Sequence, residues 1–263
     1  MLCSKKDSSR TTMNDESQPR PRMFPNEYLD QISDAIQLSS SVAGSSSLIA
    51  KISSLLARIV SEETGSVHPG QLYVELDGLL FELKCISHLI RQQSSEAITY
   101  EPPGIDPSGK LIDLTYSTND GLNGMECKAT NPRTNDRPIP YELFANELLI
   151  TNQLYYSWIS SARSHLLEFL VDTEAKLTNY PKFNRSILCI YKNFYIEDFE
   201  LEHIWHFYKK GVPAPNDTFS KMMLFEVSRK GFAFQGSING LLAIPFEQYG
   251  FGLREDDEII KLD

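Results

Sequence analysis

The clearest pattern near the start of the chain is an apolar stripe with helical spacing. In residues 46–60, five apolar side chains fall on one face of a helix: Leu48, Ile52, Leu55, Leu56 and Ile59. Residues 26–37 carry a second helical pattern, and the serine-rich residues 38–47 between the two predict a flexible link. We therefore expect residues 26–66 to form a helical element. Residues 1–25 are polar and lack periodicity, which predicts a disordered tail.

The next segment has two interpretations. Its apolar residues keep one helical stripe across the whole segment: Leu72, Leu76, Leu79, Leu80, Leu83, Ile86 and Ile90. The dipeptide Asp77-Gly78 also favours a hairpin turn, but a hairpin explains only the first half of the segment. We prefer the helix. Gly78 then lies inside it at a cost of about 1 kcal/mol relative to Ala, which suggests that backbone passes close by.

Strand-like segments follow this helix. Residues 98–104 begin as a strand, which two prolines stop. Residues 109–132, with the sequence GKLIDLTYSTNDGLNGMECKATNP, predict a hairpin. Its connection, residues 117–124, is polar and glycine-rich and is expected to be longer than a tight turn.

Alternation along this hairpin brings charged side chains together. Glu126 and Lys128 share one face of their strand, and Asp113 lies on the polar face of the preceding strand; the opposite faces carry Ile112, Leu114, Tyr116, Met125, Cys127 and Ala129. The apolar faces are expected to be buried, so two carboxylates and an ammonium should meet in one cleft. An ordinary exposed pair between Glu126 and Lys128 on an edge strand is the alternative, and would contribute little.

The second half of the chain alternates between the two patterns. Residues 141–171 form a long helical pattern with a candidate break near 151–152, residues 185–191 suit a buried central strand, and residues 197–210 predict a helix that begins with acids and ends with lysines. Further strands are expected at 222–228, 232–235 and 238–246, with a turn at 229–231. The order of elements predicts an α/β fold with a mixed sheet, in which residues 67–263 form the core domain.

The charged cleft has the composition of a metal site. Two neighbouring acids repel each other unless a cation joins them. A few hard oxygen ligands, with room for water and phosphate oxygens, describe a Mg²⁺ site, which Mn²⁺ can also fill. A lysine beside such an ion can orient or help deprotonate water, or stabilise charge on a phosphate.

These residues resemble the PD-(D/E)xK nuclease superfamily, whose restriction-endonuclease-like core has the order αβββαβ. Asp113 matches the lone acid and Glu126-Cys127-Lys128 matches the E-x-K element. The chain contains E-x-K three times, at Glu82-Leu83-Lys84, Glu126-Cys127-Lys128 and Glu174-Ala175-Lys176. Context selects the second, because the first lies in a helical pattern and the third in a polar stretch after one.

The resemblance implies a metal-dependent phosphodiesterase, most plausibly a DNA endonuclease acting as a homodimer. Asp113 and Glu126 would bind the metal together with the backbone carbonyl of Cys127, and Lys128 would position the attacking water. A glutamate from the first core helix would act through water or at a second metal; Glu82 is preferred, with Glu75 in reserve. Gln153 on the second core helix is a weaker candidate for contact with water or phosphate.

The net charge of −10 argues against a protein that grips long stretches of nucleic acid by charge alone. Arg133 and Arg137, in the proline-rich residues 131–140, are candidate phosphate contacts, or simply solvated loop cations. Two other functions stay open. The chain could be a non-catalytic binding or targeting subunit that keeps the nuclease fold, or a hydrolase directed at RNA.

The remaining signals are mostly negative. The four cysteines contain no C-x-x-C pair, so neither a disulfide framework nor a zinc ribbon is supported. His203 and His206 lie one turn apart without a third ligand of clear spacing, and we interpret them as structural. No apolar run approaches the roughly 20 residues that span a bilayer, and the N-terminus lacks the apolar region of a signal peptide. We expect a cytoplasmic protein with no membrane partner.

Overall fold

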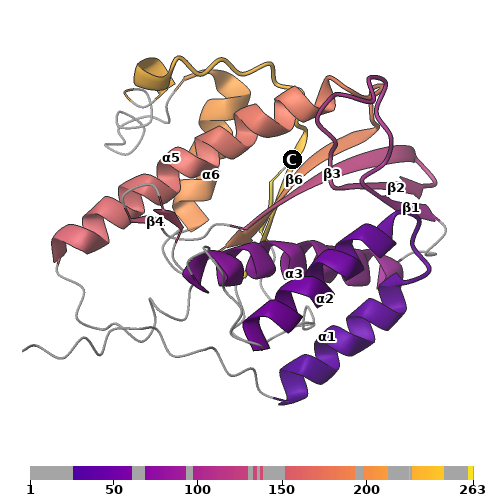
Figure 1. Ribbon diagram of the computed structural model, residues 1–263. Coiled ribbons are helices and arrows are strands. Elements are labelled where there is room, and N and C mark those ends of the chain that lie inside the picture. Colours follow the sequence, from indigo (N-terminus) through magenta and orange to yellow (C-terminus); the bar gives the residue numbers. More distant parts are fainter. Residues whose placement is uncertain are drawn as a thin grey trace, which may run out of the picture.

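The computed structural model in Figure 1 describes most of the chain outside its first 25 residues. The described residues are 26–60, 69–92, 97–129, 133–134, 137–138, 152–192, 198–212, 225, 227–245 and 260–262. The predicted disordered tail, residues 1–25, lies outside them. None of the described helices combines the length and apolar composition needed to cross a membrane.

A six-stranded mixed sheet forms the centre of the protein. Its spatial order is β1-β2-β3-β6-β7-β8. The strands are β1 (Ile98–Tyr100), β2 (Leu114–Thr118), β3 (Gly121–Ala129), β6 (Arg185–Lys192), β7 (Gly240–Pro245) and β8 (Ile260–Leu262). β6 is parallel to both of its neighbours, β3 and β7, and the other pairs are antiparallel. The predicted α/β class with a mixed sheet is therefore confirmed.

Helices cover both faces of this sheet (Figure 1). They are α1 (Asn26–Ser39), α2 (Ser45–Val60), α3 (Pro69–Gln92), α5 (Asn152–Leu177) and α6 (Asp198–Lys210). The buried residues of α1, α2 and α3 form one hydrophobic cluster with one face of the sheet, including Met125 and Cys127 of β3. Those of α5 and α6 form another cluster with the opposite face, including Leu188 and Ile190 of β6. Successive side chains of each central strand thus point to different helical layers.

Helix α3 runs without interruption through Asp77-Gly78, so the hairpin alternative is wrong and the helical prediction is confirmed. The expected close approach of backbone to Gly78 is not found: a Cβ placed there would meet nothing within 4 Å. The glycine is therefore not required by packing.

The connection between β2 and β3 is much shorter than expected. β2 ends at Thr118 and β3 begins at Gly121, which leaves a two-residue turn, and most of the predicted loop 117–124 is strand. The polar residues pair across the hairpin instead of forming a loop. The buried Asn123 donates through Nδ2 to Thr118 Oγ1 (3.2 Å) and to the carbonyl of Gly121 (3.3 Å).

The link between α1 and α2 is tied to the sheet, which corrects the prediction that it is flexible. The Tyr100 N–H donates to the Ala43 carbonyl (2.8 Å), and Ser45 Oγ donates to the carbonyls of Ser39 and Val42. Gly44 has φ +85°, and a Cβ there would lie 2.2 Å from the Tyr100 carbonyl oxygen. The serines bind local backbone, and the glycine allows β1 to approach.

The expected strands at 222–228 and 232–235 are wrong. The described residues 225 and 227–230 are helical, and residues 232–239 form no strand. The backbone of residues 232–239 makes hydrogen bonds to a side chain instead. The N–H groups of Gln235 and Ser237 donate to the Glu174 carboxylate at 2.7 and 3.0 Å. The expected strand after residue 238 is present as β7. The short β8, from the acidic C-terminal segment, was not expected.

Candidate active site

Asp113 and Glu126 lie beside each other on the face of the sheet that α5 and α6 cover. Leu114 pairs with Met125 in the antiparallel hairpin. Asp113, which precedes Leu114, therefore faces Glu126, which follows Met125. The Cys127 N–H donates to Asp113 Oδ2 (2.7 Å), which fixes this carboxylate against β3. Glu126 is only 1% exposed. The hairpin thus brings together the two acids that the sequence pattern singled out.

Two lysines bind the Glu126 carboxylate. Lys128 Nζ lies 2.7 Å and Lys176 Nζ lies 2.5 Å from the same oxygen, Glu126 Oε1. Lys176 Nζ also lies 3.7 Å from Asp113 Oδ1, so one ammonium contacts both carboxylates. The second oxygen, Glu126 Oε2, is buried and accepts no hydrogen bond from the described residues. This oxygen can therefore still accept a hydrogen bond or bind a cation.

Asp172 of α5 connects this pair to the surface. Its Oδ2 lies 3.0 Å from Lys128 Nζ, and its Oδ1 lies 2.7 Å from Nζ of the exposed Lys110. Burial alone would raise the pKa of Asp172, but the two ammonium groups outweigh it and lower the pKa to about 2. Burial would lower the pKa of Lys128, and the Glu126 carboxylate reverses this and raises it. Lys128 therefore stays protonated at neutral pH.

Glu82 approaches the same region from α3. Its Oε2 accepts a hydrogen bond from the Tyr100 hydroxyl (2.7 Å). Burial is the main cause that raises the pKa of Glu82 to about 7; the Tyr100 hydrogen bond acts against this rise, and the charge of Glu126 adds to it. Glu75, the reserve candidate, is exposed on the same helix. Of the two glutamates, Glu82 is the one whose electrostatics are coupled to the site.

The pKa of Asp113 is raised as well. Burial is the largest cause, followed by the negative charges of Glu126 and Glu82, while Lys176 and the Cys127 N–H act in the opposite direction. Glu126 of β3 and Glu82 of α3 thus act on Asp113 through their charges. Both charges disfavour the ionisation of Asp113 in the folded state, and perturbed carboxyl pKa values are common at functional sites.

The loop that delivers Asp113 is fastened to the end of α5. Asn179 accepts from the Asp106 N–H (2.7 Å) and donates to the carbonyl of the same residue (3.0 Å). The Tyr180 hydroxyl donates to the Pro102 carbonyl and accepts from the Ile112 N–H. These contacts hold the segment before Asp113 against the end of α5, the helix that carries Lys176.

Lys176 and Asp172 were missed at the level of sequence. The third E-x-K element, Glu174-Ala175-Lys176, was placed in a polar stretch after the helix, but α5 continues to Leu177. A helix of that length puts Phe169, Asp172 and Lys176 on one face by their spacing of three and four residues. This spacing is the sequence signal that could have identified Asp172 and Lys176. The choice of Glu126-Cys127-Lys128 is not affected, but Lys176 of the third element also contacts Glu126.

The other sequence candidates give less information. Arg133 and Arg137 lie on two short paired strands, β4 (Arg133–Thr134) and β5 (Arg137–Pro138), in place of the expected loop, and Gln153 lies in the first turn of α5. The side chains of all three fall outside the described residues. Within the described ranges, no group of three or more His, Cys, Asp or Glu residues could hold a metal ion, and this includes His203 and His206.

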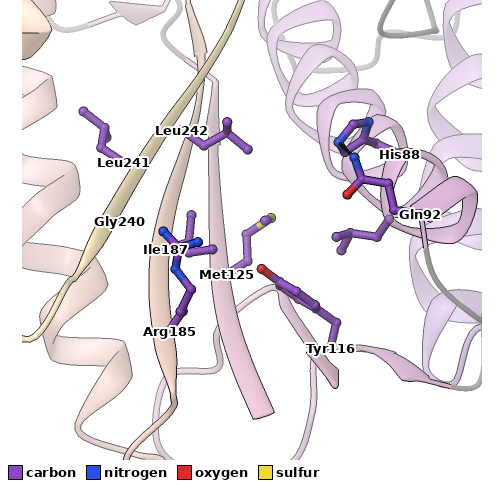
Figure 2. Close-up of a pocket in the computed structure, with 10 residues that line it drawn as sticks. His88, Gln92, Tyr116, Met125, Arg185, Ile187, Gly240, Leu241 and Leu242 are labelled. Carbon is purple, nitrogen blue, oxygen red and sulfur yellow. Dashed lines mark hydrogen bonds between the residues drawn. The ribbon is translucent and has the colours of Figure 1, made fainter. Parts of the chain in front are cut away.

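A separate cavity of about 210 Å³ opens on the α3 side of the sheet (Figure 2). Figure 2 shows His88 and Gln92 of α3 opposite Tyr116 and Met125 of the sheet. Met125 and Glu126 are neighbours in β3 and point to opposite faces. This cavity therefore does not belong to the cluster of carboxylates and lysines.

No protein-family model and no curated protein matches this sequence. A comparison with solved structures found a likeness to "The structure of Pyrococcus Furiosus SfsA in complex with Ca2+", with 11% sequence identity and a TM-score of 0.20. The match covers 74% of this chain and 64% of that chain, so less than two thirds of that structure is spanned. A TM-score this low supports no conclusion about function, which has to be argued from the residues of this chain.

Proposed function

We propose that this protein is a divalent-metal-dependent nuclease that hydrolyses phosphodiester bonds, with DNA as its substrate and cleavage within the strand. The observation that carries the proposal is the juxtaposition of Asp113 and Glu126 with Lys128 beside them. The element order α3-β1-β2-β3-α5-β6, with β6 parallel to β3, supports a PD-(D/E)xK core. In that core the lone acid precedes the strand that carries E-x-K, as Asp113 precedes β3 here.

The residues present fit a hard divalent cation. Glu126 Oε2 is buried and accepts no hydrogen bond from the part of the chain that the structure describes. The Cys127 N–H binds Asp113 Oδ2, so Asp113 Oδ1 is available to a cation and now lies near Lys176. Two carboxylates do not complete a coordination shell, so the Cys127 carbonyl, water and phosphate oxygens would supply the rest, as is usual for Mg²⁺. Mn²⁺ would substitute. When bound, the ion would offset the negative charge that develops on the phosphate.

The chain's own groups would then orient the reactants. Lys128, protonated and held between Glu126 and Asp172, would donate a hydrogen bond to the attacking water and stabilise charge on the phosphate. The water oxygen bonds to phosphorus and gives up a proton to solvent as the opposite P–O bond breaks, and the leaving oxygen takes up a proton from solvent water. Glu82 would act through a water molecule or at a second ion. Lys110, Arg133 and Arg137 are the candidates for contact with the nucleic-acid backbone.

The test is cleavage by purified protein of plasmid DNA, linear duplex, single-stranded DNA and RNA, in Mg²⁺, Mn²⁺ or EDTA. Glu126→Ala and Lys128→Ala should each abolish a metal-dependent activity. Lys230→Ala is the matched control, because Lys230 pairs with Glu168 on the surface and away from the carboxylates. Cleavage of RNA alone would replace DNA as the substrate. Activity that survives in Glu126→Ala would overturn the site assignment.

The second candidate is a non-catalytic binding or targeting subunit. It is favoured by one specific observation, that two ammonium groups already neutralise Glu126 Oε1. In that case the cluster would be an internal ion-pair network. Folded protein that binds no divalent ion and cleaves no substrate would select this function. A homodimer, expected for an enzyme that cuts both strands, would be tested by light scattering of the same preparations.

A further inference from the structure

Lys176 holds the position between two carboxylates that a metal ion would take. Its ammonium lies 2.5 Å from Glu126 Oε1 and 3.7 Å from Asp113 Oδ1. Lys128 contacts Glu126 and Asp172 instead. We infer that the Lys176 ammonium and a divalent cation compete for one place between Asp113 and Glu126, and that Lys176 withdraws when the ion binds. The inference rests on the proposed metal dependence and adds a positioning residue to it.

Electrostatics oppose joint occupancy of the place between Asp113 and Glu126. Like charges a few ångström apart in a site of low dielectric repel strongly, and here one of them would be divalent. The carboxylates also offer few positions for a second cation. Glu126 Oε1 already accepts from two ammonium groups, and Asp113 Oδ2 accepts the Cys127 N–H. Only Glu126 Oε2 and Asp113 Oδ1 are left, and the second of these faces Lys176.

Asp172 provides a place for the displaced ammonium. It precedes Lys176 by four residues on α5, so the two side chains lie on the same face of the helix, and the Lys176 charge already contributes to the lowered pKa of Asp172. The side chain can reach Asp172 by rotation of its own bonds, without movement of the helix. Asp172 now binds Lys128, so the arrival of Lys176 would loosen Lys128 at the moment when the ion and a phosphate are present.

The test measures cation binding rather than catalysis. Ca²⁺, a hard cation without redox chemistry, is titrated by calorimetry into wild type, Lys176→Met, Lys128→Met and Lys176→Arg, all confirmed as folded by circular dichroism. Lys176→Met should bind Ca²⁺ about tenfold or more tightly than wild type, a typical size for coupling between two ligands of one site. Lys128→Met should gain clearly less, because Lys128 does not bridge the acids. Lys176→Arg keeps a cation in place and should gain nothing.

Chemical labelling tests the withdrawal itself. Reductive methylation followed by mass spectrometry should modify Lys176, now 15% exposed, faster after Ca²⁺ is added to wild type. Unchanged labelling in the bound state would overturn the inference, as would equal gains for Lys128→Met and Lys176→Met. If wild type and Lys176→Met bind Ca²⁺ equally, the competition is refuted while the metal site stands. If no variant binds any divalent ion, the proposed metal dependence falls with it.

Discussion

Neutralising Glu126 and neutralising Asp113 should affect stability differently, although the two carboxylates are neighbours. Glu126 is 1% exposed and accepts from two lysines whose side chains are 20% and 15% exposed. Removing one partner from a buried ion pair costs about 3–5 kcal/mol. Lys128 keeps Asp172 and Lys176 keeps Asp113, so we expect Glu126→Gln to lower the free energy of unfolding by about 2–3 kcal/mol, below that range.

Asp113→Asn should leave the free energy of unfolding unchanged or raise it, within about 1 kcal/mol. The asparagine carbonyl can still accept the Cys127 N–H. Because the pKa of Asp113 is raised in the folded state, the fold favours the neutral side chain. A carboxylate with a raised pKa makes the fold less stable as the pH rises through the interval between its unfolded and folded pKa values. The advantage of asparagine should therefore be greatest on the alkaline side.

Urea unfolding in EDTA measures the free energy of unfolding of both variants. For a chain of this size, 1 kcal/mol corresponds to a shift in melting temperature of about 2–4 °C, so Glu126→Gln should melt about 4–12 °C lower. Glu168→Gln is the control, since its surface pair with Lys230 should contribute at most about 1 kcal/mol. If Glu126→Gln were as stable as wild type or more so, repulsion among the acids would outweigh the two lysine contacts, and our account of the cluster would be refuted.

Three further predictions concern the surroundings of the site. The pKa of Glu82 is raised from 4.5 to about 7, so wild-type stability should fall as the pH rises across that interval, and urea unfolding of Glu82→Gln should show a smaller fall; equal slopes would contradict this. Gly124→Ala should destabilise the protein by about 1–3 kcal/mol, because its Cβ would lie 2.7 Å from the Phe183 ring. Gly78→Ala lies in open space and should stabilise the protein by up to about 1 kcal/mol. A melting temperature of Gly124→Ala equal to or above that of Gly78→Ala would be evidence against the packing described. Asn179→Ala should speed hydrogen exchange in residues 104–110, which its side chain holds, and unchanged exchange would show that this contact does not order the loop.

The alternation of polar and apolar residues was sufficient to predict that Asp113 and Glu126 lie together at the centre of the site. Alternation on β2 and β3 decides which side chains share a face, and an antiparallel hairpin then brings Asp113 to Glu126. The helical stripe of α3 likewise outweighed the Asp77-Gly78 turn signal, because helical spacing over 24 residues is a stronger constraint than one dipeptide. Both inferences depend on neighbours in sequence.

What sequence could not provide depends on distant contacts. The end of α5 was placed too early because Thr173 and Glu174 are polar, yet both are buried. Glu174 is satisfied by the Tyr208 hydroxyl and by the backbone of residues 235 and 237, all far along the chain. Two of these contacts use backbone N–H groups of residues 232–239, which form no strand. The early end predicted for the helix is also what hid Lys176.

The cluster combines features that stabilise the fold with features that do not. Lys128 and Lys176 compensate one oxygen of Glu126, as a structural network would. The other oxygen is buried and accepts no hydrogen bond from any residue that the structure describes, and the pKa values of Asp113 and Glu82 are both raised. A network selected only for stability gains nothing from an unsatisfied carboxylate oxygen or from acids whose charges oppose the ionisation of Asp113. Costs of this kind concentrate where a site must bind something the folded chain does not itself contain, which supports the proposed cation.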